Sequence, residues 1–216
     1  MDRLTVTGKL IDSGLVAVIR LNSGAKLPGI IEALCQGGVN ALEITMTTPG
    51  ALAIIKDIAE KTGDDFLIGA GSVLDPETAR QAILNGAQFV VGPVFNPEVL
   101  RLCHRYDKVD IPGAFTPTEI LAAWEQGADI VKVFPATTLG PGYMKDVLGP
   151  LPQVKLLPTG GVTLANAAEF IRAGACCLGV GTALLDKKMI AAEDWPALAK
   201  HAAAFRAAVL DGRTGK

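Results

Sequence analysis

The chain has 216 residues and a net charge of −2; 50% of its residues are hydrophobic, 19% are charged and 24 are glycine. This apolar content excludes an intrinsically disordered protein, and the near-neutral charge argues against a protein that binds nucleic acid through a basic surface. The longest uncharged stretch, 81–97, contains two asparagines, two prolines and two glycines. It is therefore unsuitable as a transmembrane helix, which needs about 20 apolar residues.

After an expected N-terminal helix, eight short apolar runs recur along the chain, each followed by a segment with helix signals. We predict strands at 15–20, 41–45, 66–69, 88–91, 109–111, 129–134, 154–158 and 176–180. Neighbouring runs start about 20 to 26 residues apart, which is the length of one strand, one helix and short loops. Several runs are apolar at every position, which is typical of parallel strands buried on both faces.

The segments between these runs carry helix-capping residues. Asp75-Pro76, Asn96-Pro97 and Thr116-Pro117 each place a capping side chain before a first-turn proline. The last helix is predicted at 195–209.

These patterns predict a single domain over residues 1–216, folded as one (β/α)8 TIM barrel with an extra N-terminal helix. No linker, low-complexity tract or change in composition divides the chain. A doubly wound open sheet is the alternative, but it would normally have fewer strands and a GxGxxG turn after the first strand.

The cysteines and the N-terminus bear on the cellular compartment. Neither a CxxC pair nor zinc-ligand spacing occurs among the cysteines, which are Cys35, Cys103, Cys176 and Cys177. We expect buried thiols in a reducing compartment. The N-terminus lacks an apolar segment that ends in a cleavage site, so a cytoplasmic location is expected.

His104 and His201 fall in helical segments, away from the predicted strand ends. We expect a surface or helix-packing role for both, because no cluster of carboxylates and histidines with ligand spacing accompanies them. The sequence therefore predicts neither a metal ion nor another cofactor.

Two charged residues lie inside predicted strands. Alternation places Glu43 on the same face of its strand as Thr45, and Lys132 on the same face as Phe134. A charge in a buried strand is costly unless it is paired, shifted in pKa or used in chemistry. One interpretation is a buried ion pair; the other is that Lys132 is a nucleophilic amine and that Glu43 moves protons for it.

Other residues at the predicted strand ends suit an anionic ligand. Arg20 ends the first strand, either as a surface residue or as a clamp for a carboxylate or phosphate. Gly160-Gly161 and Gly181-Thr182 follow the seventh and eighth strands, whose loops commonly hold a phosphate in such barrels. Glycine pairs are also common in ordinary turns.

Five segments together resemble the bacterial KDPG/KHG aldolases, which are 2-keto-3-deoxy-6-phosphogluconate and 4-hydroxy-2-oxoglutarate aldolases. The segments are LEIT at 42–45, GAGSVL at 69–74, IPGAFTPTE at 111–119, VKVFPA at 131–136 and PTGGV at 158–162. The resemblance extends from about residue 15 to residue 185 with matching order and spacing, and five motifs in order are specific.

This resemblance implies a class I aldolase without a metal ion, usually a homotrimer. Lys132 would form a Schiff base with the C2 ketone of the substrate or of pyruvate, and Glu43 would be the general acid/base. The expected reaction, as in the Entner–Doudoroff pathway, converts 2-keto-3-deoxy-6-phosphogluconate into pyruvate and glyceraldehyde 3-phosphate. Cleavage of 4-hydroxy-2-oxoglutarate to pyruvate and glyoxylate is a second expected activity.

The resemblance also implies where the substrate lies. The 6-phosphate would contact Gly160, Gly161, Gly181 and Thr182. Thr159 matches the phosphogluconate-type members, whereas phosphogalactonate-type relatives tend to be apolar there. The remaining substrate-binding residues are expected at strand ends, and they are Ser72, in the pyruvate pocket, Pro93 and Phe134.

One position departs from the family pattern. Many members carry Arg four residues after the catalytic Glu, where it holds the substrate carboxylate, but this sequence has Thr47. Our hypothesis is that Arg20, helped by Thr47 and Ser72, replaces that arginine.

Two alternatives remain open. Another phosphate-binding barrel enzyme, such as an isomerase, a phosphate-ester synthase or a phosphogalactonate aldolase, would share the strand-end glycines. A non-catalytic barrel that binds a keto acid or serves as an assembly scaffold would need neither Glu43 nor Lys132. In each case the expected partners are small molecules, and neither nucleic acid nor a membrane.

Overall fold

The computed structural model describes residues 1–21, 24–63 and 66–215, in which strands alternate with helices. The strands are β1 (Leu15–Ile19), β2 (Ala41–Thr45), β3 (Leu67–Gly71), β4 (Phe89–Val91), β5 (Val109–Ile111), β6 (Gly113–Ala114), β7 (Val131–Val133), β8 (Leu156–Pro158) and β9 (Leu178–Val180). The helices are α1 (Arg3–Ser13), α2 (Leu27–Gln36), α3 (Ala51–Lys61), α4 (Pro76–Leu84), α5 (Pro97–Arg105), α6 (Pro117–Glu125), α7 (Gly140–Leu148), α8 (Ala167–Arg172), α9 (Lys187–Ala192) and α10 (Trp195–Thr214).

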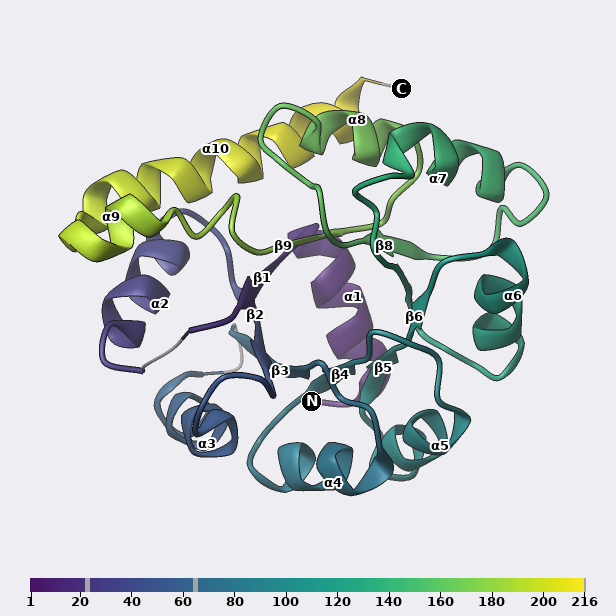
Figure 1. Cartoon of the computed structure of the whole chain (residues 1–216), viewed down its shortest axis with the longest axis horizontal. Coiled ribbons are helices and arrows are strands. Elements are labelled where there is room, and N and C mark those ends of the chain that lie inside the picture. Colours follow the sequence, from purple (N-terminus) through teal and green to yellow (C-terminus); the bar gives the residue numbers. More distant parts are fainter. Residues whose placement is uncertain (22–23, 64–65, 216) are drawn as a thin grey trace.

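The strands pair in parallel in two sheets. The larger sheet has the order β5-β4-β3-β2-β1-β9, and the smaller one has the order β6-β7-β8. Pro112 separates β5 from β6 because it has no N–H to donate, while its carbonyl accepts from the Lys132 N–H at 2.9 Å. An isolated bridge between Thr159 and Gly179 links the end of β8 to β9. The predicted α/β fold with parallel strands is confirmed. Figure 1 shows the helices from α2 onward outside the strands, whereas α1 appears in the middle of the view.

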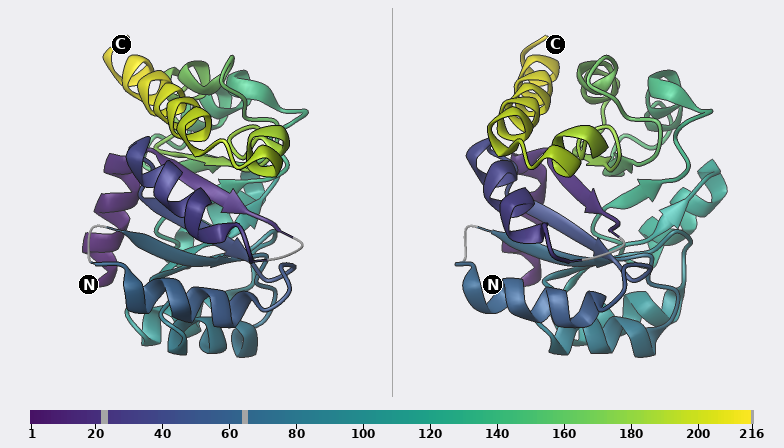
Figure 2. Two further views of the ribbon diagram at one scale, coloured as in Figure 1. Left: turned by 90° about the vertical axis from the view of Figure 1, so that its left-hand side faces the viewer. Right: turned by 60° about the vertical axis from the view of Figure 1, so that its left-hand side comes forward.

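Apolar side chains form two separate cores. One lies between the strands and the surrounding helices and includes Ile19, Ile44 and Ile55, all fully buried. The other lies on the inner face of the strands, near their first residues, and contains Phe89. Val6 and Leu10 of α1 pack into the inner core, so α1 covers the amino-terminal ends of the strands, as the turned views in Figure 2 illustrate.

The helix starts follow the predicted capping residues. Asp75 and Asn96 accept hydrogen bonds from the first backbone N–H groups of α4 and α5. Thr116 caps α6 in a capping box with Glu119, in which each side chain accepts from the other residue's backbone. The last helix is longer than predicted and continues to Thr214, because Gly212, beyond the predicted end, is buried against Ile171 of α8 and α10 packs along α8 and α2.

The cysteine prediction was wrong for Cys35, which is exposed on α2; Cys103 and Cys177 are buried and Cys176 is partly buried. The last two are adjacent, with their sulfur atoms 3.6 Å apart. Among the described helices, none combines the length and apolar character required to cross a membrane.

Candidate active site

Glu43 lies at the centre of β2, on the inner face of the curled sheet. Its side chain is only 2% exposed. Burial raises the pKa of the Glu43 carboxyl group, while the positive charges of Lys132 and Arg20 act in the opposite direction. A carboxyl group with a raised pKa takes up a proton more readily than an exposed one, which suits a general acid/base.

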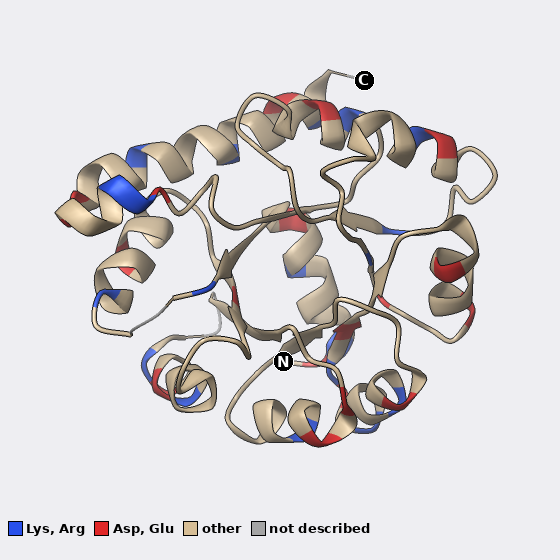
Figure 3. Ribbon diagram, viewed as in Figure 1, with Lys and Arg blue, Asp and Glu red and all other residues tan. Residues whose placement is uncertain are grey.

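Lys132 lies at the centre of β7 and is 5% exposed. Its Nζ is 4.8 Å from the centre of the Phe134 ring, and Phe134 is itself 36% exposed. Figure 3 shows that most charged residues colour the outer helices and that few colour the strands. Glu43, Lys132 and Arg20 are brought close enough to interact electrostatically, although their strands are far apart in sequence.

Threonine hydroxyls gather where β2 ends. The Thr45 Oγ1 atom is 3.0 Å from the hydroxyl of Thr47 and 3.3 Å from the hydroxyl of Thr48. The Thr48 hydroxyl also accepts from the Leu21 N–H at 3.4 Å. These contacts link the loop after β2 to the segment after β1, where Arg20 is exposed.

Ser72 follows β3 directly, Pro93 follows β4 after Gly92, and both are half-buried. Ser72 has φ of +59°, a backbone conformation that is uncommon outside glycine and is often found at functional sites. The Pro93 carbonyl lies so close to Gly113 that any side chain at position 113 would collide with it.

The ends of β8 and β9 form a second part of the candidate site. Gly160 and Gly161 have φ of +86° and +75°, so the turn requires glycine at both positions. The Thr159 side chain is 7% exposed, and its hydroxyl oxygen has no hydrogen-bond partner among the described residues. Gly181 and Thr182 follow β9, where Thr182 is exposed and Gly181 is half-buried.

The comparisons with known proteins decide the family. Residues 6–201 match the family model described as KDPG and KHG aldolase. The chain belongs to this family. As a KDPG/KHG aldolase family member it is an enzyme of the aldolase type, a carbon–carbon lyase.

The chain is similar to named members of the KDPG/KHG aldolase family. It is 36% identical to the 2-dehydro-3-deoxy-phosphogluconate aldolase of Pseudomonas aeruginosa, over 85% of this chain and 84% of that protein. It is 35% identical to the 2-dehydro-3-deoxy-6-phosphogalactonate aldolase of Escherichia coli K12, over 79% and 83% of the two chains. Among solved structures, the KDPG aldolase of Legionella pneumophila, with pyruvate captured as a covalent carbinolamine, superposes with a TM-score of 0.85. That alignment has 28% identity and covers 92% of this chain and 97% of the other.

Three features of this family member escaped the sequence analysis as parts of the site. Thr48 joins the hydroxyl cluster, and its signal was the run of hydroxyl residues in TMTT at 45–48. Thr137, after β7, lies against Gly161, where an added Cβ would be 2.6 Å from the Thr137 Cα. Gly71 lies against the Glu43 carboxylate.

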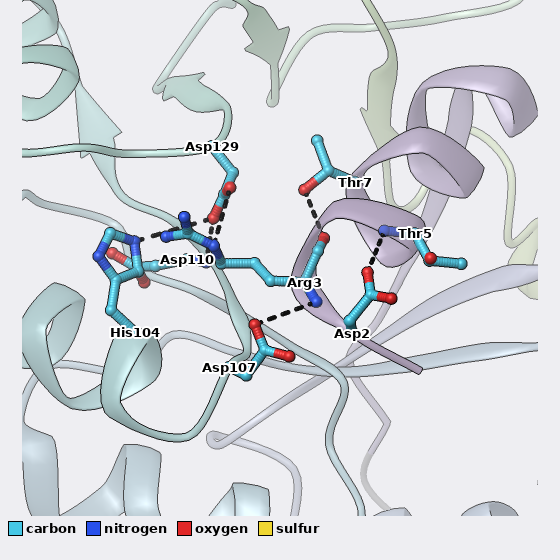
Figure 4. Close-up of polar contacts among 8 residues, drawn as sticks. All are labelled: Asp2, Arg3, Thr5, Thr7, His104, Asp107, Asp110 and Asp129. Carbon is cyan, nitrogen blue, oxygen red and sulfur yellow. Dashed lines mark hydrogen bonds and ion pairs between the residues drawn. The ribbon is translucent and has the colours of Figure 1, made fainter.

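A second group of titratable residues, partly or fully buried, lies beside α1. Figure 4 shows Arg3, His104 and Asp129 meeting there, with Asp110 beside them. Asp129 pairs with Arg3 at 3.6 Å and lies 4.0 Å from His104, and it accepts a 3.4 Å hydrogen bond from the Asp110 N–H. No three His, Cys, Asp or Glu side chains are arranged to hold a metal ion in the part of the chain that the structure describes.

His201 has a packing role in the structure. Its Nε2 lies 2.8 Å from the Ala183 carbonyl oxygen, and its ring contacts Phe205 edge-on at 5.2 Å. His104 lies 4.0 Å from Asp129 in the group beside α1. His104 lies in α5 and His201 lies in α10, so both histidines are in helices, as expected from the sequence.

Proposed function

We propose that this family member is a class I aldolase that cleaves 2-keto-3-deoxy-6-phosphogluconate to pyruvate and glyceraldehyde 3-phosphate. The observation that carries the proposal is the buried pair of Lys132 and Glu43, which interact electrostatically in the interior of apolar strands. A pair that served stability alone would be poorly justified, because apolar residues often replace buried ion pairs without loss of stability.

The proposed reaction starts with attack of the neutral Lys132 amine on the C2 ketone. The resulting carbinolamine loses water to give a protonated imine. Glu43 accepts the proton of the C4 hydroxyl as the C3–C4 bond breaks, the imine takes up the electron pair of that bond, and the aldehyde leaves. Glu43 then delivers a proton to C3 of the enamine, and water hydrolyses the imine to release pyruvate and free Lys132. Burial raises the pKa of Glu43, and this favours proton uptake by its carboxyl group in this role.

We further propose that Arg20 binds the substrate carboxylate. Arg20 is exposed, yet close enough to influence the pKa of Glu43, and a guanidinium group suits bidentate binding of a carboxylate. Thr47 and Ser72 would supply hydroxyl groups to the same ligand.

Replacing Arg20 with alanine is expected to raise the KM for pyruvate in C3 proton exchange by at least about tenfold, because a charged hydrogen bond contributes about 1.5–3 kcal/mol. Steady-state exchange kinetics measure this value. The matched control is Arg80→Ala, which removes an arginine that lies over Tyr106 between α4 and α5. An unchanged KM in the Arg20 variant would contradict the proposal.

The proposed phosphate site comprises Gly160, Gly161, Gly181 and Thr182. Gly160 and Gly161 have positive φ, a backbone conformation that residues with a side chain rarely adopt. This conformation can turn their backbone N–H groups toward a phosphate. Thr159, whose buried hydroxyl lacks a partner among the described residues, offers a hydrogen bond to the sugar-acid chain. Pro93 and Phe134 would line the space between the pyruvate and phosphate ends.

The decisive experiment is reduction with borohydride in the presence of pyruvate. Covalent addition of the pyruvate carbon skeleton to the Lys132 peptide, seen by mass spectrometry, is the expected result. An unmodified Lys132 peptide would overturn the Schiff-base mechanism and favour an isomerase, a synthase or a non-catalytic barrel.

A panel of 2-keto-3-deoxy acids then assigns the substrate through pyruvate release. We expect the 6-phosphogluconate compound to be cleaved with the highest kcat/KM, ahead of its galactonate epimer and of 4-hydroxy-2-oxoglutarate. The epimer is a necessary comparison, since a relative that is 35% identical is named a phosphogalactonate aldolase. A higher kcat/KM for that epimer would change the substrate assignment while leaving the mechanism intact.

We also propose that the two sheets together form one closed eight-stranded barrel domain, in which β5 and β6 count as a single interrupted strand. The link at Pro112 and the bridge between Thr159 and Gly179 support closure.

We propose a homotrimer that buries apolar side chains near the strand ends. Leu74, Val94 and Phe115 are 57%, 55% and 41% exposed in the loops after β3, β4 and β6. Light scattering coupled to gel filtration is expected to give three times the mass of the chain, and Val94→Asp is expected to weaken the assembly. A monomer at micromolar concentration would contradict this proposal.

A further inference from the structure

Gly71 is the last residue of β3, and a side chain at this position would collide with Glu43. A Cβ added to Gly71 would lie 1.9 Å from Glu43 Oε1 and 2.5 Å from Cδ and Cγ of the same side chain. The Glu43 carboxylate therefore lies directly on the bare Cα of Gly71.

The backbone at this position gives no reason for glycine. Gly71 is absent from the described residues with positive φ and is part of the parallel ladder, where Thr45 is its partner. Alanine adopts extended backbone as readily as other residues, so space is the remaining reason for the missing side chain.

Neither partner can easily move aside. The Gly71 carbonyl accepts from the Met46 N–H at 2.7 Å, which holds the end of β3 against β2. Glu43 lies opposite Gly69 in the ladder, and the Phe89 ring covers Gly69 so closely that a Cβ there would be 2.2 Å from it. Phe89 is fully buried, so it occupies the space next to Glu43 along the inner face.

We propose that Gly71 is a positioning residue for the general acid/base, in that its bare Cα lets the Glu43 carboxylate lie against β3 and face Lys132. The catalytic consequence of this inference rests on the proposed function. The steric relation between Gly71 and Glu43 does not depend on that function. A methyl group at position 71 would displace the carboxylate by an ångström or more, and a misplacement of that size can cost about 10²-fold in rate.

The test combines Gly71→Ala with two shortened forms of Glu43 and measures the exchange of pyruvate C3 protons in D2O by NMR. Gly71→Ala is expected to slow exchange about 10- to 100-fold, while borohydride at the end of a long incubation still traps pyruvate on Lys132. Glu43→Asp makes room for the methyl group, so it is expected to reduce the exchange rate by a much smaller factor in the Gly71→Ala background than in the wild-type enzyme. Gly8→Ala is the control, since a Cβ on Gly8 of α1 would meet nothing within 4 Å.

A thermal double-mutant cycle tests the contact without any reference to activity. Gly71→Ala is expected to lower the Tm, and at least half of that loss should disappear in the Glu43→Ala background, where the methyl group finds empty space. An equal loss in both backgrounds, or exchange by Gly71→Ala at the wild-type rate, would overturn the inference. Wild-type enzyme that neither exchanges protons nor forms the imine would instead overturn the proposed function, and the thermal cycle would still decide the role of Gly71.

Discussion

Replacing Lys132 with methionine is expected to abolish aldol cleavage and pyruvate trapping while the fold is retained. Methionine keeps most of the side-chain length against Phe134, so packing in β7 is preserved, but it has no amine to attack the ketone. We expect kcat to fall by at least about 10⁴-fold, because removal of a covalent nucleophile from an enzyme costs this much or more. Pyruvate release measured with a coupled assay provides the comparison, and circular dichroism checks the fold.

Lys155→Met is a matched control for this variant. Lys155 also lies over an aromatic ring, 5.4 Å from the centre of Trp124, but it is exposed and precedes β8. It should retain wild-type kcat. Full activity of the Lys132 variant would show that the site catalyses a reaction that does not pass through an imine.

The elements that could be predicted from sequence are those with strong local signals. The helix starts at Asp75, Asn96 and Thr116 follow from capping side chains whose hydrogen bonds span only three residues or fewer. The strand at 41–45 has the predicted bounds.

Features that depend on distant partners could not be predicted in this way. β6 is two residues long and exists because β7 pairs with it beyond Pro112. α10 illustrates the same point at a helix end, since it continues to Thr214 as a result of its packing along α8. Gly71 could be recognised only when the position of the Glu43 side chain was known.

Glu43 and Lys132 were identified because each is a charged residue inside an apolar strand. Asp110 has the same position in its strand, although the sequence analysis did not single it out. Asp110 is the central residue of β5 and is 1% exposed. Its neighbours Val109 and Ile111 belong to the inner core, so the Asp110 side chain is on the opposite face, toward α5. A charge in a buried strand therefore indicates a constraint of some kind, and only the surroundings distinguish a catalytic group from a destabilising one.

The surroundings of Asp110 are those of a destabilising group. Neither of its carboxylate oxygens has a hydrogen-bond partner among the described residues, and the same holds for Nη1 of Arg3. Burial, together with a smaller contribution from the negative charge of Asp129, raises the pKa of Asp110 to about 8. Arg3 is paired with Asp129 instead, as Figure 4 shows.

Asp110→Asn is expected to stabilise the protein increasingly as the pH rises from about 4 to about 8. The unfolded chain releases the Asp110 proton near its ordinary pKa of 3.8, whereas the folded chain keeps it until about 8. The unfolded state is therefore favoured by rising pH across this window, and wild-type stability declines with it. Asparagine has a similar shape and no charge, so the variant lacks this decline.

The expected gain is small at pH 4 and reaches roughly 2 to 5 kcal/mol above pH 8, given that one pKa unit corresponds to about 1.4 kcal/mol. Urea unfolding followed by the fluorescence of Trp124 and Trp195, at intervals from pH 4 to pH 9, measures it. Asp146→Asn on the exposed side of α7 is the control and should leave the pH dependence unchanged. Parallel stability curves for wild type and Asp110→Asn would show that the carboxyl group is ionised at little cost in the folded protein. Because Asp110 faces α5 and not the inner face that carries Glu43 and Lys132, the stabilised variant should keep wild-type kcat.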